Sequence, residues 1–424
     1  MNIVIATVLV VLFAASVPVA VSIGLASATG IAFFSNLPLL LVPQRIFVGI
    51  DSFPLMAVPF FILAGNLMSA GGVSARLVSF SKSLVGRMQG GLAGTCVVTC
   101  MIFAAVSGSS VATTFAIGAI LIPAMVRHGY PVPMAASIQA SSAELGVIIP
   151  PSVPLILFGV STETSVGQLF IAGFGPGLLI ATALIVMVLI WCRVKGYGKE
   201  DGKECDPILQ SFQRAFLALL MPVIIIGGIY GGIFTPTEAS AVAVVYGLLL
   251  GMVVYRTIHF SDLPAIFRQS VVSAGSVMLI IATAALFSFL ISRSGLPNHI
   301  GEWAQETFSH RYSFLLAINL LLFVIGMFLE TSAAILVLAP ILTPIAVAFG
   351  VDPVHFGIIV VVNLALGMFT PPLGVNLFAA CQVANIPVDR VIGSLSLPVA
   401  VVFGCLMLIT YLPPITLFLR DALY

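Results

Sequence analysis

This sequence contains few charged residues. Asp, Glu, Lys and Arg make up 7% of its 424 residues, whereas 60% are hydrophobic and the mean hydropathy is +1.21. A soluble domain usually carries about 25% charged residues. A fold this apolar would have too few polar side chains to cover a surface in water. We therefore expect a chain that is solvated by lipid. The net charge of +1 offers no basic surface, which excludes nucleic acid as a partner.

Metal-binding and disulfide patterns are also missing. The six cysteines are scattered, and Cys96 and Cys100 lie one helical turn apart without a histidine or acid nearby. Small side chains on a helix-packing face explain this pair better than a transition-metal site. A basic segment before the first apolar run is absent as well, because the first charged side chain is Arg45. A cleavable signal peptide needs such a segment, so we expect the first span to stay in the membrane.

What the chain does have is a motif that occurs twice. The segment 146–151 recurs as 367–372, an offset of 221 residues, and each copy ends in a pair of prolines. The same offset carries Ser110 onto Thr331, so the stretch 110–151 is repeated without insertion or deletion. Each proline pair breaks a helix inside an apolar span. A duplicated broken helix in an apolar chain is typical of a secondary transporter.

The apolar runs predict an all-α, polytopic membrane protein. A helix that crosses a bilayer needs about 20 apolar residues, and most of the runs are close to this length. The ordinary spans are predicted near 3–16, 18–34, 53–69, 168–191, 215–233, 239–255, 270–291 and 391–412, and the broken spans near 131–160 and 353–381.

Two further apolar stretches, 88–125 and 313–349, are too short for two full crossings. Each has small polar residues at its middle, at 107–110 in the first stretch and at 330–332 in the second. A re-entrant helical hairpin, which enters and leaves the membrane on one side, fits both facts. Non-helical backbone at that depth is tolerated only where protein buries it or where it lines a cavity.

The distribution of basic residues predicts the orientation. With the N-terminus on the periplasmic side, 12 of the 16 Lys and Arg residues fall on the cytoplasmic side and four on the outer side. This asymmetry agrees with the positive-inside rule. The first hairpin then enters from the cytoplasm and the second from outside, so the two repeats are inverted. The amphipathic segments 73–87 and 296–311 read as arms in the membrane interface. The polar segment 193–214 links the two halves.

These predictions divide the chain into five parts. Residues 1–87 form scaffold helices and the first interfacial arm, and 88–167 form the first repeat of the transport unit, a hairpin followed by a broken helix. Residues 168–312 hold the linker, further scaffold helices and the second arm. Residues 313–386 form the second repeat, and 387–424 form a C-terminal scaffold helix.

The hairpin tips and the helix breaks are the predicted cation sites. Hydroxyls, and carbonyls freed by a break, supply oxygen ligands without formal charge, and sodium is the expected guest. The competing explanation is that the serines are small residues that only stabilise the packing of one helix on another. The residues assigned to cation binding are Ser107, Gly108, Ser109, Ser110, Gly146, Ile149 and Pro150, with Glu330, Thr331, Ser332, Gly367 and Thr370 in the second repeat.

An anionic substrate is expected between the two cation sites. Short helices that begin inside the membrane expose free N–H groups and a partial positive charge, which favour an anion. No Lys or Arg falls at a depth where it could do the same. The residues assigned to substrate contact are Ser109, Ser110, Ser152, Thr331 and Asn376.

Two acids, Glu144 and Glu330, lie in apolar surroundings. An ionisable side chain inside a membrane is a candidate functional group, because its charge is expensive there. Each acid could take a proton, bind a cation or accept hydrogen bonds from hairpin amides. For Glu144 a structural hydrogen bond to a neighbouring helix end is the favoured interpretation, whereas for Glu330 the two interpretations stay open.

The ordered motifs resemble one known family. The motifs are Pro59–Gly65 with Gly71-Gly72, then Ser107–Ala112, Ile149–Ser152, Phe158–Val160, and Thr370–Pro372 with Gly374. Together they resemble the large membrane subunit of tripartite ATP-independent periplasmic (TRAP) transporters, the DctM family, along nearly the whole chain. Glu330-Thr331 departs from the pattern, because a shorter acid or a different set of small residues is expected there. The detailed ligands of the second cation site are therefore open.

The resemblance implies a fold and a function. The fold is of the ion-transporter type and works as an elevator, in which hairpins and broken helices slide against a scaffold. The function is uptake of organic acids such as C4-dicarboxylates, sialic acid or other sugar acids across the bacterial inner membrane. Sodium ions drive this uptake and no other cofactor is implied. The implied partners are a small membrane subunit and a periplasmic substrate-binding protein.

Three other classes remain as alternatives. A self-sufficient sodium/carboxylate carrier would need no binding protein. A membrane enzyme would need a nucleophile with a base, or a metal cluster, and neither is visible in the sequence. A passive channel would need a continuous polar pathway, against which the duplicated hairpins argue.

The helix break at Pro150-Pro151 gives a first testable prediction. Replacing both prolines by Ala lets the helix continue, so the carbonyls freed by the break are used inside the helix. We expect transport to be abolished while the protein still inserts in the membrane. The measurement is uptake by cells that express the double variant at the wild-type level, and a normal rate would contradict the break.

Overall fold

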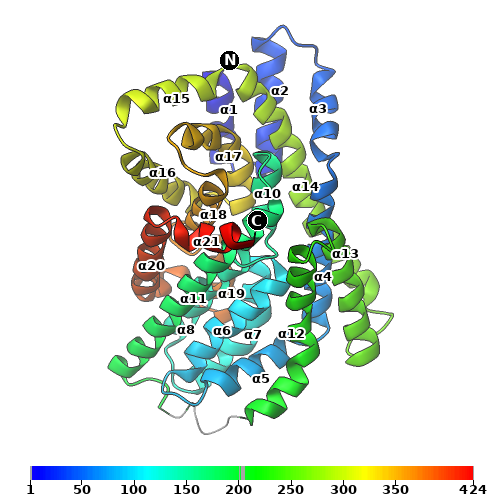
Figure 1. Ribbon diagram of the computed structural model, residues 1–424, viewed down its shortest axis with the longest axis vertical. Coiled ribbons are helices and arrows are strands. Elements are labelled where there is room, and N and C mark those ends of the chain that lie inside the picture. The colour runs from blue at the N-terminus through cyan, green and yellow to red at the C-terminus, as the bar shows by residue number, and fades with distance from the viewer. Residues whose placement is uncertain (1, 200, 202–205, 424) are drawn as a thin grey trace.

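A computed structural model describes residues 2–199, 201 and 206–423 of the chain. Every regular element in this part is helical, and eight helices are long and apolar enough to cross a membrane, or nine if one bent pair counts as a span. The predicted all-helical membrane fold is confirmed (Figure 1). Of the predicted linker 193–214, residues 200 and 202–205 lie outside the described residues.

The first repeat consists of a helical hairpin and a broken helix. The hairpin is α6 (Gly91–Ser107) and α7 (Ser110–Arg127). The broken helix is α8 (Val132–Ala143), the short α9 (Leu145–Ile148) and α10 (Val153–Ser161), with a bend of 43° at the break. A long helix, α11 (Val166–Lys195), follows.

The second repeat has the same order of elements. Its hairpin is α16 (Arg311–Gly326) and α17 (Thr331–Ala348), and its broken helix is α18 (Pro353–Met368) and α19 (Val375–Ala384). The long helix α20 (Val388–Tyr411) follows. The peptide bonds Pro150-Pro151 and Pro371-Pro372 are both cis, so the two breaks share their local geometry as well as their sequence. Figure 1 shows α6 and α7 in the lower half of the molecule and α16 and α17 in the upper half, as inverted repeats require.

The two repeats interlock rather than lie side by side. Helix α19 of the second repeat packs on α7 and α8, and α10 of the first repeat packs on α17 and α18. Each post-break helix therefore inserts between the elements of the other repeat. The long helices join the same body, because α11 packs on α6, α18 and α20, and α20 also packs on α8.

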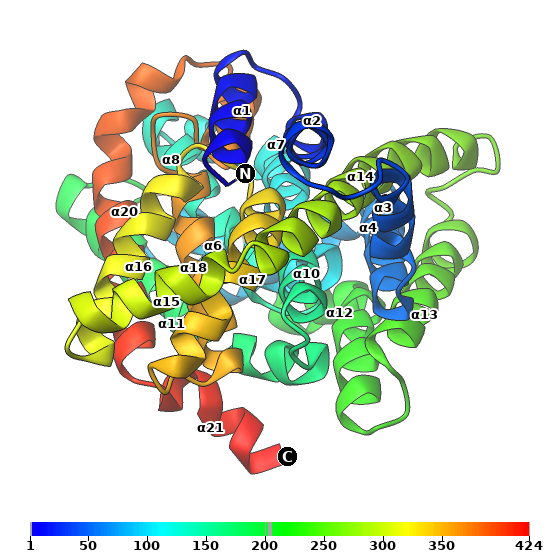
Figure 2. The same cartoon turned by 90° about the horizontal axis from the view of Figure 1, so that it is seen from above.

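The remaining helices form a second layer. They are α1 (Asn2–Ala14), α2 (Val19–Phe34), α3 (Leu41–Ile50), η1 (Phe53–Met56), α4 (Ala57–Ala70), α12 (Ile208–Tyr230), α13 (Pro236–Leu248), η3 (Leu249–Val254) and α14 (Leu263–Arg293). Helix α4 packs on α13 and α14, and α14 also packs on α2, α3 and α17. Seen from above, α14 runs from this layer towards the repeats (Figure 2). We call this layer the scaffold layer.

Two amphipathic helices precede the hairpins, where the sequence predicted arms. They are α5 (Val73–Val85) and α15 (Leu296–Thr307), and they lie at opposite ends of the molecule in Figure 1. Two other short helices, α3 and α21 (Pro414–Leu423), were not predicted. Helix α3 was missed because prolines and Arg45 interrupt its apolar pattern, and α21 because it is short and carries Arg420 and Asp421.

The segment after each long helix returns to the turn between hairpin and broken helix. In the first repeat, the carboxylate of Asp201 accepts the N–H of Leu92 at 3.1 Å and lies 3.3 Å from Nδ1 of His128. In the second, Arg420 of α21 pairs with Asp352 at 2.7 Å. Burial alone would raise the pKa of Asp352, but the hydrogen bond from Arg420 holds the pKa below its ordinary value. Both repeats are thus closed by a polar contact outside the apolar region.

Helix α21 gives a test of the fold through Gly175 of α11. A Cβ on Gly175 would overlap the backbone carbonyl oxygen of Ile415, which cannot move away as a side chain can. We expect Gly175→Ala to destabilise the protein by roughly 1–3 kcal/mol through overpacking. The measurement is the melting temperature of the purified chain in detergent.

The matched control is Gly404→Ala in α20. A Cβ there meets nothing within 4 Å, so this change should keep or slightly raise the melting temperature through helix propensity. Equal melting temperatures for the two variants would contradict the described contact between α11 and α21.

Candidate functional site

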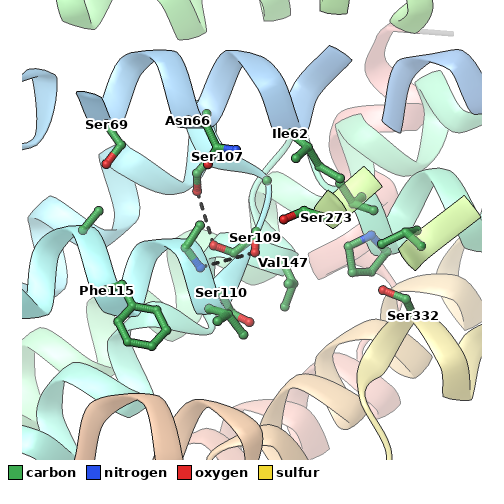
Figure 3. A pocket seen from close by; sticks show the side chains of 18 of the residues that line it. Ile62, Asn66, Ser69, Ser107, Ser109, Ser110, Phe115, Val147, Ser273 and Ser332 are labelled. Carbon is green, nitrogen blue, oxygen red and sulfur yellow. Dashed lines mark hydrogen bonds between the residues drawn. The ribbon is translucent and has the colours of Figure 1, made fainter. Parts of the chain in front are cut away.

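A cavity of about 460 Å³, lined by both apolar and polar side chains, lies between the scaffold layer and the two repeats. One wall is formed by α4 and α14, and the other by the tips of both hairpins and the helix breaks. Figure 3 shows Asn66 and Ser273 on the scaffold side, and Ser107, Ser109, Ser110 and Ser332 on the other. The cavity therefore touches both predicted cation regions.

The first hairpin tip is a tight turn made by Gly108. Helix α6 ends at Ser107, and Gly108 has a φ of +62°, in the left-handed region that favours glycine. Ser109 then caps α7, because its hydroxyl accepts the N–H of Ala112 at 3.4 Å. Ser107 donates to the carbonyl of Ser109 at 3.3 Å. The tip thus exposes hydroxyl and carbonyl oxygens without a charged group.

The helix break lies directly on this tip. The N–H of Val153, just after the break, donates to the carbonyl of Gly108 at 3.3 Å. A Cβ on Gly146 would lie 2.8 Å from the carbonyl oxygen of Ser109, so only glycine allows this approach. The two features that the sequence assigned to one cation site are therefore in contact.

The second repeat repeats this arrangement with one difference. The N–H of Leu373, just after the break, donates to the carbonyl of Met327 in the hairpin tip at 3.2 Å. The cap of α17, however, is the carboxylate of Glu330, which accepts the N–H groups of Ser332 and Ala333 at 2.9 and 3.3 Å. The first tip is capped by a hydroxyl and the second by a carboxyl group, so the two ends of the cavity present different polar groups.

The two tips meet at Met368. Ser110 and Thr331, which occupy equivalent positions in the two repeats, place their hydroxyls 3.8 and 2.8 Å from its sulfur. Equivalent positions of the two repeats therefore meet at this side chain. An ion at one tip would lie near an ion at the other, on either side of Met368.

The predicted residues divide into two groups. The first lines the cavity and consists of Ser107, Gly108, Ser109, Ser110, Glu330 and Ser332. The second is buried and is not among the lining residues, and it consists of Gly146, Ile149, Pro150, Ser152, Thr331, Gly367, Thr370 and Asn376.

Ser152 and Asn376 have partners other than the cavity. Ser152 caps α10 by accepting the N–H of Leu155 at 3.3 Å, and its hydroxyl donates to the carbonyl of Val147. The amide of Asn376 binds Thr114 and Glu144 inside the protein. Their predicted contact with substrate remains a prediction.

The scaffold wall contributes polar residues that were not assigned to the site. Asn66 and Ser69 come from α4, and Gln269 and Ser273 from α14. Asn66 also donates to Ser270 at 2.8 Å, which ties α4 to α14. The signal that could have found these residues is an amide or hydroxyl within an apolar span, since such groups rarely face lipid.

No Lys or Arg is among the residues that line this cavity. The first turns of α7 and α10 are capped by the neutral Ser109 and Ser152, so their N-termini keep a partial positive charge. At the N-terminus of α17, the carboxyl group of Glu330 already accepts two of the free N–H groups. The helix N-termini therefore place partial positive charge near the first hairpin, where the sequence predicts an anionic substrate. Among the described residues, no group of three or more His, Cys, Asp or Glu could hold a metal ion.

The chain belongs to the family described as "Tripartite ATP-independent periplasmic transporter, DctM component", which it matches over residues 6–415. The resemblance found in the sequence motifs is thus confirmed.

Several relatives are similar along the chain. The C4-dicarboxylate TRAP transporter large permease protein DctM of Pseudomonas aeruginosa is 42% identical over 94% of both chains. The sialic acid TRAP transporter large permease protein SiaM of Vibrio cholerae is 39% identical over 94% of this chain and 91% of its own. The isethionate TRAP transporter permease protein DctMQ of Oleidesulfovibrio alaskensis is 42% identical over 95% of this chain, which spans 64% of that protein.

A solved structure shares the fold. The YdaH transporter of Alcanivorax borkumensis matches with a TM-score of 0.66, over 89% of both chains and at 16% sequence identity. At this identity the match supports the fold alone.

The turn at Gly108 gives a test of the site. A Cβ there would lie 2.8 Å from the carbonyl oxygen of Pro151, so Gly108→Ala should push the tip away from the break. We expect uptake to be lost. The measurement is uptake normalised to the amount of protein in the membrane.

The control is Gly129→Ala in the turn between α7 and α8. Gly129 also has a positive φ, of +83°, but a Cβ there meets nothing within 4 Å. This change should cost only the left-handed strain of about 1–2 kcal/mol and leave uptake measurable. Equal losses in both variants would show that backbone strain, rather than contact with the break, accounts for the effect.

Proposed function

We propose that this chain is the large permease subunit of a TRAP transporter that couples the uptake of an organic acid to sodium. The observation that carries the proposal is the paired contact between hairpin tip and helix break, present in both repeats and open to one cavity. The family and the names of the relatives support the transport role and the organic-acid class.

Sodium is the proposed coupling ion because the tips offer oxygen ligands of low charge. Hard cations prefer carbonyl, hydroxyl and carboxylate oxygens. The first site would use Ser107–Ser110 with 146–150, and the second Glu330–Ser332 with 367–370. The two sites differ in the carboxylate of Glu330, so the second should hold sodium more tightly than the first.

The proposed substrate is an organic anion held without a cationic side chain. The cavity of about 460 Å³ is of the size that small-molecule sites usually have. The N-termini of α7 and α10 would bind the carboxylate, and Ser109 and Ser110 would donate hydrogen bonds to it. Sodium ions bound at the hairpin tips and helix breaks would add positive charge on the side of the repeats. Asn66 and Gln269 would contact the substrate from the scaffold side.

Movement of the repeats against the scaffold layer would carry this site across the membrane. The cavity lies at the boundary between these two bodies, where sliding changes which side it faces. Coupling requires that sodium and substrate bind one state of the carrier better than the other. Since α11 and α20 pack on the repeats, we include them in the moving body, beyond the boundaries 88–167 and 313–386.

The proposed surroundings follow from the family. The chain would lie in the bacterial inner membrane with its N-terminus on the periplasmic side, as the basic residues predict. A small membrane subunit would pack on the scaffold layer, and a periplasmic binding protein would deliver the substrate. The DctMQ relative, of which this chain spans 64%, is longer than the aligned part, which leaves room for a further subunit-like segment.

The function is tested by uptake into vesicles that contain the purified transporter. Sodium gradients are imposed or omitted, and a panel of binding proteins is added one at a time. The proposal requires uptake that depends on both. Uptake of free substrate without a binding protein would favour a self-sufficient carrier, and sodium-independent, non-saturating flux would favour a channel.

The hydroxyls on either side of Met368 give a specific prediction. Replacing Ser110 and Thr331 together by Ala removes one oxygen from each proposed cation site. Since a hydrogen-bond-sized interaction is worth about 1 kcal/mol at each site, we expect the half-saturating sodium concentration to rise about fivefold. The measurement is sodium activation of uptake.

The control is the double change Ser137→Ala and Ser141→Ala in α8. Both hydroxyls are buried and donate to carbonyls of their own helix. This variant should keep the sodium dependence of the wild type. Unchanged sodium activation in the Ser110/Thr331 variant would contradict the site placement.

A further inference from the structure

Glu144 lies in the protein interior at the junction of α8 and α9, with 1% of its surface exposed. One of its carboxylate oxygens accepts the amide N–H of Asn376, which lies in the first turn of α19. The other oxygen, Oε2, has no hydrogen-bond partner among the described residues. A buried carboxylate with an unpartnered oxygen needs a counter-charge or a proton.

In the part of the chain that the structure describes, no basic side chain pairs with this carboxylate. The helices packed against α8 and α9 are α6, α7, α10, α11, α18, α19 and α20. Their charged residues lie in terminal turns, and their other titratable groups are mostly thiols. The set is Cys96, Cys100, Arg127, Cys192, Arg193, Lys195, His355, Cys381, Asp389, Arg390, Cys405 and Tyr411.

Three more oxygens are linked to Glu144 through the side-chain amide of Asn376. The hydroxyl of Thr114 lies 3.0 Å from the carbonyl oxygen of Ser110 and 3.3 Å from Oδ1 of Asn376. Oxygens that share a cation at about 2.4 Å in an octahedral arrangement lie roughly 3.4 Å apart. The two distances from the Thr114 hydroxyl are close to this spacing. Turning the Asn376 amide over would direct its oxygen towards Glu144 instead of towards Thr114.

This group has no counterpart in the other repeat. The offset of 221 residues carries Glu144 onto Ala365 and Thr114 onto Ile335, and it carries Leu155 onto Asn376. All three equivalent side chains are apolar. The group is therefore distinct from the two repeat-related sites, although it shares Ser110 with the first of them.

We propose that Glu144, Asn376, Thr114 and the carbonyl of Ser110 form a third sodium site, which lies between the two repeats. The carboxylate matches the charge of one sodium ion, and the ion satisfies Oε2. Because α7, α8 and α19 all contribute, a bound ion fastens the post-break helix of one repeat to the hairpin of the other. The inference rests on the proposed sodium coupling, and it adds one bound ion to each chain.

The experiment is equilibrium binding of radioactive sodium to the purified full-length chain in detergent. The number of ions bound per chain is measured for the wild type and for Glu144→Gln. We expect the variant to bind one sodium fewer and to gain less thermal stability from sodium. Equal stoichiometry in the two proteins would overturn the proposal and would identify Glu144 as a protonated, structural carboxyl.

Matched variants separate this outcome from misfolding. Thr114→Val removes a ligand oxygen and should also lose one ion, whereas Thr114→Ser keeps the hydroxyl and the full number. Ser142→Ala changes a buried side chain of the same helix α8 whose hydroxyl has no partner, and it should bind as the wild type does. A loss in Ser142→Ala equal to that in Glu144→Gln would overturn the proposal, because the effect would then not be specific to the site.

The result also distinguishes this inference from the proposed function. A wild-type chain that binds no sodium would remove the coupling ion from the proposed function itself. A wild-type chain that binds sodium, with Thr114→Val and Glu144→Gln binding the same number, would overturn the third site alone.

Discussion

The fold depends on how interrupted helices satisfy their backbone inside an apolar protein. A helix that stops within the membrane leaves N–H and C=O groups without partners, and lipid offers none. Here the backbone groups freed by a helix break form hydrogen bonds with those freed at a hairpin tip. The N–H after the first break donates to the first hairpin tip through Val153 and Gly108, and the same occurs between Leu373 and Met327 in the second repeat. The hairpins and the breaks therefore have to occur together.

This mutual dependence creates the site. A tip and a break that meet leave carbonyl and hydroxyl oxygens beyond those needed for their own hydrogen bonds, and the inverted repeats bring two such places to one cavity. The difference between them lies in the caps, Ser109 in the first tip and Glu330 in the second. In the proposed function, such a carrier would bind an anion and cations together without Lys or Arg in the cavity, because helix ends and bound ions would provide the positive charge.

Much of this arrangement could be predicted from the sequence, for a physical reason. The proline pairs, their constant offset and the polar residues at 107–110 and 330–332 are local signals, and each has a direct structural effect. The scaffold wall could not be placed, because nothing in the sequence tells which face of α4 and α14 carries Asn66 or Gln269 to the cavity. The partners of Glu144 and Asn376 also depend on how the repeats interlock, which is a long-range property of the fold.

Cryo-EM maps of the complete transporter in sodium and in potassium would show directly whether ions occupy the junctions between hairpin tips and helix breaks. We expect density for an ion at each junction in the sodium map, at 107–110 with 146–150 and at 330–332 with 367–370, and weaker density there in potassium. Sodium density located elsewhere, with both junctions unchanged between the two maps, would contradict this expectation.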